Sequence, residues 1–267
     1  MGTAMVTGAS AGLGLEFAWQ LATARHDVVL VARDGERLHR LASQLEAAAG
    51  VRTEVIVADL ADRSQLDPLV ERLQHPIRPV GLLVNNAGFA IAQPFIGGDL
   101  AREENALDVM VRAVMVLSHA AAGAMVPRRR GAILNVSSIA SLIASGTYSA
   151  HKAWVRSFTE GLSVELRGTG VTATAVCPGF VHTEFHERGD IDTTMFPEVT
   201  FLNPEDVVAE ALAAVRRGAV LTTPSLRYKV VAGTARVAPR WAIRTFGRYR
   251  RELESARGGR AQDERTA

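Results

Sequence analysis

Six short runs of mainly apolar residues alternate along the chain with longer stretches whose apolar side chains recur at helical spacing. The runs are TAMVTG, DVVLVA, TEVIVA, GLLVNN, AILNVS and VTATAVCP, and the helical stretches include 13–25, 34–49, 63–74 and 100–126. Because the runs are nearly continuous in apolar residues, they are typical of strands buried on both faces of a parallel sheet. The pattern predicts an α/β, Rossmann-like fold, a doubly wound parallel sheet of about seven strands with helices on both faces.

Neither an internal repeat nor a low-complexity linker interrupts residues 1–225. The apolar content of 48% in 267 residues supports a substantial core, so we expect one domain over this range. Residues 226–267 form a separate predicted unit, a basic C-terminal extension that is partly helical and ends in a disordered tail.

The N-terminal sequence MGTAMVTGASAGLG lacks the basic and apolar regions of a signal peptide. Charges interrupt the apolar runs, so we expect no bilayer-spanning window of about 20 residues. The single cysteine, Cys177, excludes an internal disulfide framework and is best interpreted as a small buried hydrophobe. These features predict a cytoplasmic protein.

The net charge of +2 at pH 7 conceals an asymmetry. Residues 226–251 contain eight Lys and Arg and no acid, which leaves −5 on residues 1–225 and −1 on residues 252–267. Because no recognised module accompanies this charge, we expect no nucleic-acid binding.

The same basic segment is amphipathic beyond Pro239, where apolar side chains follow at helical spacing among arginines: Trp241, Ala242, Phe246 and Tyr249. That pattern is typical of helices that lie on anionic membranes, so peripheral membrane contact through 226–251 is one interpretation. A helix packed on its own domain or on a partner subunit is the other, and the sequence leaves both open.

Glycines punctuate the turn between the first predicted strand and the first helix, in VTGASAGLG. Gly8, Gly12 and Gly14, with Ser10 and Leu13 among them, allow positive φ angles and close approach of a ligand to the backbone. The following helix N-terminus offers unpaired N–H groups to a pyrophosphate. An ordinary tight turn between strand and helix is the alternative, because the spacing departs from GxGxxG.

Four motifs occur in order: TGASAGLG, NNAG at 85–88, YSAHK at 148–152 and PGFVHT at 178–183. Together they resemble the short-chain dehydrogenase/reductase family, in its compact branch with the cofactor site first, over residues 3 to about 222. The resemblance implies a nicotinamide dinucleotide, a small-molecule carbonyl or alcohol substrate and a homo-oligomer.

The end of the second strand indicates which dinucleotide is bound. The resemblance puts Ala32 where NAD-preferring relatives carry an acid, and Arg33 follows it, suited to pair with a 2′-phosphate. NADP(H) is therefore favoured over NAD(H). Two alternatives stay open: Arg33 is a solvated loop charge, or Asp34 takes the role of the acid one residue later.

The resemblance also implies further cofactor contacts. Asp59 and Leu60 would meet the adenine, although a helix-capping role for Asp59 is an alternative. The other expected contacts are the ribose wall and the segment that holds the nicotinamide carboxamide: Asn86, Ala87, Gly88, Pro178, Gly179, Val181 and Thr183.

Tyr148 and Lys152, four residues apart, would lie on one face of a helix. A tyrosine hydroxyl can protonate the alkoxide that forms when a ketone accepts a hydride, provided that a cation lowers its pKa from about 10. The resemblance implies that Tyr148 is this acid/base, that Lys152 also anchors the nicotinamide ribose, and that Ser138 donates to the substrate oxygen. The alternative is an ordinary amphipathic helix capped by Thr147.

Two features depart from the family pattern. The interval between Ser138 and Tyr148 is about three residues short, which predicts a lower wall beside the substrate and leaves Ser141 or Ser145 as other candidates for the serine's role. Met110 stands where many relatives have an asparagine that kinks the helix and holds a water linked to the lysine. We expect a weakened proton relay, with the Met110 carbonyl or Asn105 as substitutes.

Residues 182–203 form the predicted substrate lid. Phe185, Met195, Phe196 and Phe201 give it an apolar underside, which favours a substrate with hydrophobic bulk. His182 and His186 lack a third ligand at metal spacing, so we expect no metal site.

The sequence thus predicts an NADP(H)-dependent oxidoreductase that interconverts a carbonyl and a secondary alcohol, with reduction as the favoured direction. The alternative from another class is a dinucleotide-binding sensor or scaffold without turnover. A ketone bound to an acyl carrier is a further alternative for the substrate.

Overall fold

The computed structural model describes residues 2–91, 93–184 and 197–245 of the chain. Among these residues, one parallel sheet has the strand order β3-β2-β1-β4-β5-β6-β7. Its strands are β1 (Thr3–Thr7), β2 (Asp27–Ala32), β3 (Thr53–Val57), β4 (Val80–Asn85), β5 (Gly131–Val136), β6 (Val171–Val176) and β7 (Leu221–Thr222). The predicted doubly wound sheet is confirmed. Its order reverses between β1 and β4, the point at which such sheets bind ligands.

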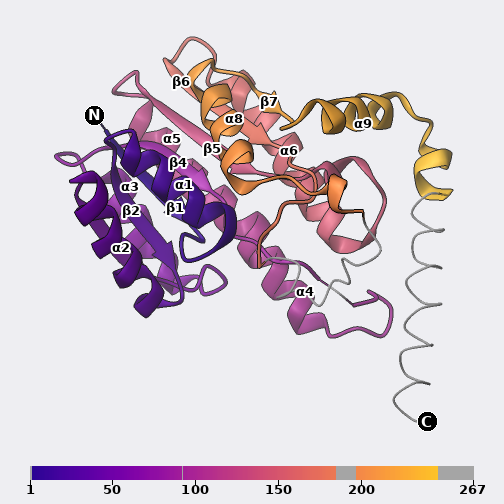
Figure 1. Cartoon of the computed structure of the whole chain (residues 1–267), viewed down its shortest axis with the longest axis horizontal. Helices are drawn as coiled ribbons and strands as arrows, with labels where there is room; N and C mark the ends of the chain where they lie inside the picture. Colours follow the sequence, from indigo (N-terminus) through magenta and orange to yellow (C-terminus); the bar gives the residue numbers. More distant parts are fainter. Residues whose placement is uncertain (1, 92, 185–196, 246–267) are drawn as a thin grey trace.

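Helices cover both faces of this sheet (Figure 1). The α-helices are α1 (Gly12–Thr23), α2 (Gly35–Ala49), α3 (Asp67–Gln74), α4 (Leu100–Leu107), α5 (Ala113–Met125), α6 (Gly146–Glu165), α8 (Pro204–Arg216) and α9 (Leu226–Val237). Short helical turns are η1 (Ser64–Leu66), η2 (Asp108–Arg112), η3 (Ile139–Leu142) and η4 (Glu198–Thr200).

Two apolar cores hold the layers together, one on each face of the sheet. On β1, Ala4 and Val6 face α1, α2 and α8, whereas Met5 faces the side of α3 and α5. All three side chains are fully buried. Alternate residues of one strand thus reach both cores, which explains why the strands are nearly continuous in apolar residues.

One long helical stretch, Leu100–Met125, comprises α4, η2 and α5. Contrary to the expectation from sequence, it contains an 18-residue window with a mean hydropathy of 1.4, long and apolar enough to cross a bilayer. Half of that window is buried inside the molecule. Because α5 contributes Leu117 and Met125 to the core on its face of the sheet, this stretch is a core helix.

The C-terminal extension begins with α9, which follows β7 in the view of Figure 1. Tyr228 and Ala232 are buried, and so is Ile243 farther along, whereas Trp241 is exposed. The start of α9 therefore packs on the domain through Tyr228, whereas Leu226, Val230, Val231 and Val237 of the same helix are exposed. The residues of the extension beyond 245 lie outside the described range, and membrane contact stays a prediction.

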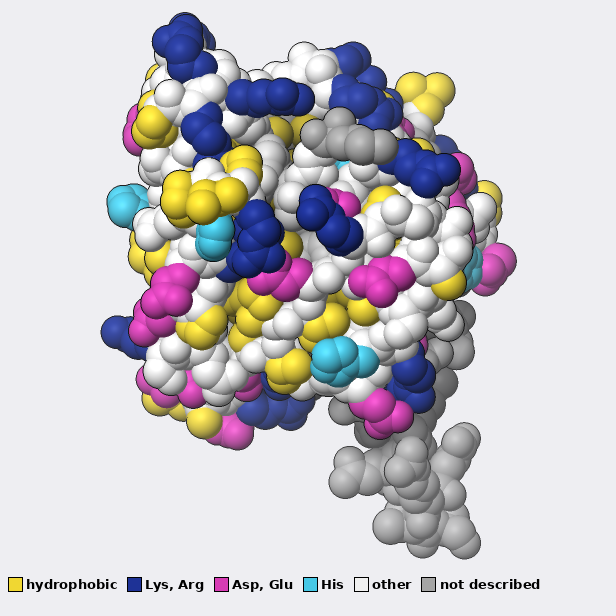
Figure 2. Space-filling model, turned by 90° about the vertical axis from the view of Figure 1, so that its left-hand side faces the viewer, with side chains coloured by type: hydrophobic (Ala, Val, Ile, Leu, Met, Phe, Trp, Pro, Cys, Tyr) yellow, Lys and Arg dark blue, Asp and Glu magenta, His cyan; other side chains and the backbone are white. Residues whose placement is uncertain are grey.

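Charged side chains of both signs share the face shown in Figure 2, where Lys and Arg lie beside Asp and Glu in the middle of the view. Individual ion pairs on α2 have the same character, since Arg40 lies 3.2 Å from Glu36.

Candidate active site

The carboxyl ends of β1 and β4 meet at the switch point and are joined through Thr7. The Thr7 hydroxyl accepts hydrogen bonds from the backbone N–H groups of Asn86 at 3.0 Å and Ala87 at 3.1 Å. The Asn86 amide in turn donates to the Thr7 carbonyl oxygen at 2.9 Å. These hydrogen bonds hold the NNAG segment against the glycine turn. The motifs in the sequence did not identify Thr7 as part of the site.

The glycine turn is closed so tightly that two of its glycines have no room for a side chain. Gly8 has a φ of +67°, and a Cβ there would lie 2.9 Å from the Asn86 amide nitrogen. A Cβ on Gly14 would lie 2.0 Å from the Gly8 carbonyl oxygen. Gly12, with φ +54°, lies against Thr183, which follows the PG motif of the sixth strand.

The first turn of α1 meets the requirements of a pyrophosphate site. Its N-cap residue, Ala11, makes no side-chain capping hydrogen bond, so the helix N-terminus keeps N–H donors for an anion. Leu13 packs against the apolar core instead of covering these donors. The residues present therefore fit a dinucleotide.

Arg33, at the end of β2, presents an exposed guanidinium whose Nη1 lies 3.9 Å from the Asp59 carboxylate, with 72% of its side chain accessible. Asp34 is engaged elsewhere: it is the N-cap of α2, and its carboxylate accepts from the Arg37 N–H at 3.0 Å. Asp34 is thus engaged in capping α2, whereas the Arg33 side chain faces solvent.

In the loop after β3, the N-cap position of η1 is Arg63, and a second aspartate, Asp62, makes the nearby side-chain hydrogen bonds. Asp62 accepts hydrogen bonds from the Ser64 N–H, the Ser64 hydroxyl and the Gln65 amide at the start of η1. Asp59 accepts from the Ala61 N–H at 3.0 Å within its own turn. Leu60 is buried in the core, with 6% of its surface exposed.

Ser138, Tyr148 and Lys152 converge beyond the carboxyl end of β5. Ser138 hydrogen-bonds the Tyr148 hydroxyl. The Lys152 ammonium lies 5.7 Å from the centroid of the Tyr148 ring and donates to the Val136 carbonyl oxygen at 2.9 Å. Helix α6 begins at Gly146 after Ser145, so Thr147 lies inside the helix and is not its N-cap.

Burial dominates the electrostatics of this triad. It raises the pKa of Tyr148 to about 12, and the hydrogen bond from Ser138 opposes that change. It also lowers the pKa of Lys152 to about 8. The Lys152 ammonium, which donates to the Val136 carbonyl oxygen, is not among the causes of the raised tyrosine pKa, and its action on the Tyr148 proton stays a prediction.

Ser137 faces away from the substrate side, as strand alternation predicts. It is 2% exposed, and its hydroxyl donates to the Lys152 backbone carbonyl at 2.7 Å. Behind it, the buried Asn135 accepts from the Asn85 amide at 2.9 Å and donates to the Thr159 hydroxyl at 2.9 Å. This chain of hydrogen bonds fixes α6 to the sheet, and its residues were not predicted.

Met110 is fully buried and lies beside the lysine. A Cβ on Gly88 would be 3.3 Å from both the Lys152 ammonium and the Met110 sulfur, so the two side chains flank the same glycine. The helix nevertheless contains a π-helical turn over Asp108–Arg112. The local irregularity is thus present without asparagine, whereas a side-chain hydrogen bond from position 110 is lost.

A second polar cluster lies between α4 and α6. The buried Glu103 carboxylate accepts from the Thr147 hydroxyl at 2.6 Å and from the Gln93 amide at 3.1 Å. His151, one turn after Thr147, is 8% exposed, and burial lowers its pKa while Glu103 raises it. Within the described residues, its Nδ1 has no hydrogen-bond partner.

The PG segment after β6 is backed by the loop that precedes α8. Val181 forms a parallel bridge with Leu202, and the His182 ring stacks on Phe201 at 4.7 Å between centroids. Phe180 lies 5.7 Å from Phe201. Of the predicted lid, Phe185, His186, Met195 and Phe196 lie outside the described residues.

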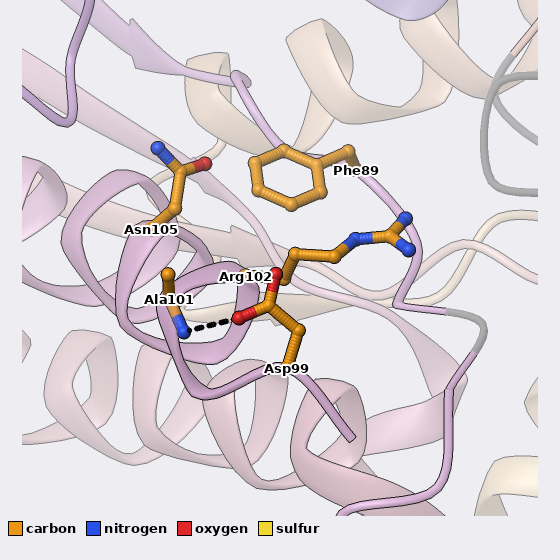
Figure 3. A pocket seen from close by; sticks show the side chains of 5 residues that line it. All are labelled: Phe89, Asp99, Ala101, Arg102 and Asn105. Carbon is orange, nitrogen blue, oxygen red and sulfur yellow. Dashed lines mark hydrogen bonds between the residues drawn. The ribbon is translucent and has the colours of Figure 1, made fainter.

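A pocket of about 260 Å³ opens beside the NNAG segment, lined by Phe89, Asp99, Ala101, Arg102 and Asn105. Figure 3 shows the Asn105 amide, the Phe89 ring and the stem of Arg102 around this space, with the Ala101 N–H bonded to Asp99. No hydrogen bond among the described residues joins Asn105 to Lys152, so this pocket, and not the lysine, is the environment that the structure gives Asn105.

Within the described residues, no group of three or more His, Cys, Asp or Glu is placed to hold an ion. His182 contacts Glu198, with Nε2 3.0 Å from the carboxylate.

The comparisons with known proteins agree with this geometry. A family model described as short chain dehydrogenase matches residues 2–192. The chain belongs to the short-chain dehydrogenase/reductase family. Members of the family named below are reductases and dehydrogenases that act on alcohols and carbonyls, and the protein is an oxidoreductase of this kind.

Among curated relatives, sulfoacetaldehyde reductase 2 of Chromohalobacter salexigens is 35% identical over 213 residues, 76% of this chain and 84% of the relative. The galactitol 2-dehydrogenase of Cereibacter sphaeroides, which forms L-tagatose, is 33% identical over 221 residues, covering 78% and 85%.

Two solved structures extend the comparison. A short-chain dehydrogenase from Sphingobium yanoikuyae in complex with NADPH is 33% identical, with a TM-score of 0.80 over 88% of this chain and 94% of that one. The alcohol dehydrogenase from Comamonas testosteroni specific for bulky-bulky ketones is 29% identical, with a TM-score of 0.76 over 98% and 94%.

Proposed function

We propose that this short-chain dehydrogenase/reductase is an NADP(H)-dependent enzyme that interconverts a carbonyl and a secondary alcohol, with Tyr148 as acid/base. The convergence of Ser138, Tyr148 and Lys152 beside the glycine turn carries the proposal. Reduction is the favoured direction, since NADP is usually held reduced in cells.

Tyr148 would exchange a proton with the substrate oxygen. When bound, the nicotinamide supplies or accepts the hydride. A phenol whose pKa lies at about 12 stays protonated near neutral pH, which suits a proton donor. Ser138 would donate a hydrogen bond to the same oxygen and stabilise the charge that develops there.

Lys152 would have two tasks. The first is to act on the proton of Tyr148. Lys152 is buried, with 4% of the residue exposed, and its ammonium is within reach of the Tyr148 ring, so its charge acts in a medium where electrostatic effects are strong. It would also donate a hydrogen bond to the nicotinamide ribose. Gly88, which keeps the space next to the ammonium clear of a side chain, supports this second task.

Three observations support NADP(H). Arg33 is exposed at the end of β2, Asp34 is committed to capping α2, and no acid occupies position 32. A guanidinium in this place suits a 2′-phosphate. The relative from Sphingobium yanoikuyae was solved with NADPH, which agrees with the proposal without deciding it.

The substrate class is supported by the aromatic side chains around the PG segment. Phe180, Phe201 and the His182 ring form one contact group. An apolar wall of this kind favours a substrate with hydrophobic bulk. The relatives act, by their names, on sulfoacetaldehyde, galactitol and bulky ketones, so the interconversion of a carbonyl and an alcohol is their shared feature.

The experiment is to follow the near-ultraviolet absorbance of NADPH while the protein is incubated with aldehydes and ketones of graded size. Tyr148→Phe is the control, because it keeps the ring and removes the proton donor. We expect consumption of NADPH by the parent and a loss of about 100-fold or more in the variant.

Binding of NADPH without consumption across the panel would support the sensor or scaffold alternative. Including a β-ketoacyl thioester in the panel tests the acyl-carrier alternative. If a carrier is recognised through the basic extension, replacing Arg240 and Arg244 by glutamine should weaken turnover of that substrate alone.

Three further expectations accompany this proposal. We expect a cytoplasmic homo-oligomer, which light scattering of the purified protein would test. Peripheral membrane contact would appear as co-sedimentation with anionic vesicles. The division of the chain at residue 225 is tested by limited proteolysis.

A further inference from the structure

Tyr228, in the C-terminal extension, lies directly over Gly179 of the PG motif. A Cβ on Gly179 would lie 2.1, 2.2 and 2.5 Å from three ring carbons of Tyr228. Such distances do not occur between real atoms, so the ring and the glycine are matched: only glycine allows the tyrosine to approach this far. The Tyr228 side chain is buried, with 8% of its surface exposed.

The Tyr228 hydroxyl joins two segments that are about twenty residues apart along the chain. It donates to the Thr200 carbonyl oxygen at 2.6 Å and accepts from the Phe180 N–H at 3.3 Å. Backbone hydrogen bonds between the same segments run from Leu202 to the Phe180 carbonyl at 2.9 Å and from His182 to the Leu202 carbonyl at 3.1 Å. One side chain thus completes the junction of the PG segment with the loop before α8.

The ring also belongs to an apolar cluster that touches each part of the candidate site. Tyr228 packs with Val181 and Leu202, and Leu13 and Ile139 pack against the same cluster. Leu13 lies between Gly12 and Gly14 of the glycine turn, and Ile139 follows Ser138. Displacement of the ring would therefore change the packing around the glycine turn, Ser138 and the PG segment together.

Helix α9 is anchored by contacts that do not involve Tyr228. Lys229 pairs with Glu210 at 2.6 Å, and the Ser225 N–H donates to the same carboxylate at 3.1 Å. Arg227 donates to the Val199 carbonyl oxygen. Because these contacts remain when Tyr228 is changed, the effect of its hydroxyl can be measured with the helix in place.

We propose that Tyr228 is a positioning residue, which holds the backbone of residues 179–181 in the position needed to bind the nicotinamide end of the cofactor. The proposal rests on the proposed function, since it assumes that this segment holds the nicotinamide. It gives the extension a part in the site: the chain beyond residue 225 would complete the cofactor pocket.

The test compares Tyr228→Phe, which removes only the hydroxyl, with Lys229→Met, which breaks the neighbouring ion pair and leaves the ring in place. Losing one or two hydrogen bonds should raise the KM and the dissociation constant for NADPH about threefold to tenfold in Tyr228→Phe. Amide exchange at Phe180 should accelerate in that variant. Lys229→Met should keep the parent values of all three quantities.

Tyr228→Ala extends the series by removing the ring. If it does not fold, Tyr228→Phe still decides, because it preserves the packing. A lower Tm with an unchanged KM for NADPH in Tyr228→Phe would overturn the proposal, since it would assign the residue a structural role only. Unchanged Phe180 exchange would overturn it as well.

Failure of the proposed function is recognised separately. If the parent consumes no NADPH with any carbonyl, the dissociation constant from NADPH fluorescence and the Phe180 exchange rate still compare Tyr228→Phe with the parent. A parent that reduces ketones while Tyr228→Phe binds NADPH equally well would leave the function intact and remove the positioning role.

Discussion

Lys152 lies 5.7 Å from the centroid of the Tyr148 ring, yet its ammonium donates to the Val136 carbonyl oxygen. The pair is thus close enough to interact, but burial moves the two pKa values apart, to about 8 for the lysine and about 12 for the tyrosine. The lysine is therefore the member of the pair that titrates near the working range of an enzyme.

The first prediction is a basic limb in the pH profile of ketone reduction. As the pH rises through about 8, Lys152 loses its proton, whereas the Tyr148 phenol keeps its own. We expect kcat/KM to fall over that interval because the ammonium is needed in its charged form. Lys152→Met should be slower by about 100-fold and should lack this limb. The same limb in the variant would show that another group titrates.

The second prediction concerns the choice of cofactor. Arg33→Ala removes an exposed cation that we assign to the 2′-phosphate, so the KM for NADPH should rise about tenfold to 100-fold while the KM for NADH changes little. Arg40→Ala is the matched control, since Arg40 is an exposed arginine paired with Glu36 on α2. Equal losses with both cofactors would contradict the assignment.

The third prediction concerns the proton relay. Met110 flanks Gly88 together with Lys152, and a thioether cannot supply the hydrogen bonds of an amide. Met110→Asn should raise kcat and shift the pH profile, because a polar group would again link the lysine to solvent. Measured profiles that coincide with those of the parent would mean that the relay does not depend on this side chain.

The fourth prediction concerns the cluster between α4 and α6. Thr147→Val removes the donor 2.6 Å from the buried Glu103 carboxylate, so the free energy of unfolding should fall by about 1–3 kcal/mol. Urea unfolding gives this quantity directly. Thr234→Val is the control, because the exposed Thr234 hydroxyl bonds only within its own helix, and it should change stability by less than about 0.5 kcal/mol.

The sequence by itself determined the sheet, the order of its elements and the family. Strands buried on both faces must be largely apolar, and that requirement is visible in the sequence as six nearly continuous apolar runs. The glycine turn could also be predicted from the sequence. The close approach of Gly14 to the Gly8 carbonyl excludes any side chain, so this turn requires glycine at that position. The spacing of Tyr148 and Lys152 followed from helical geometry alone.

Only the tertiary structure decided what depends on residues far apart in the chain. The pKa of Tyr148 is set by how completely its hydroxyl is surrounded, and no local pattern reports burial. Glu103 meets Thr147, and Tyr228 meets Gly179, across 44 and 49 positions of ordinary-looking sequence. Local pattern fixes which face a side chain presents, but the packing of the layers determines what that side chain touches.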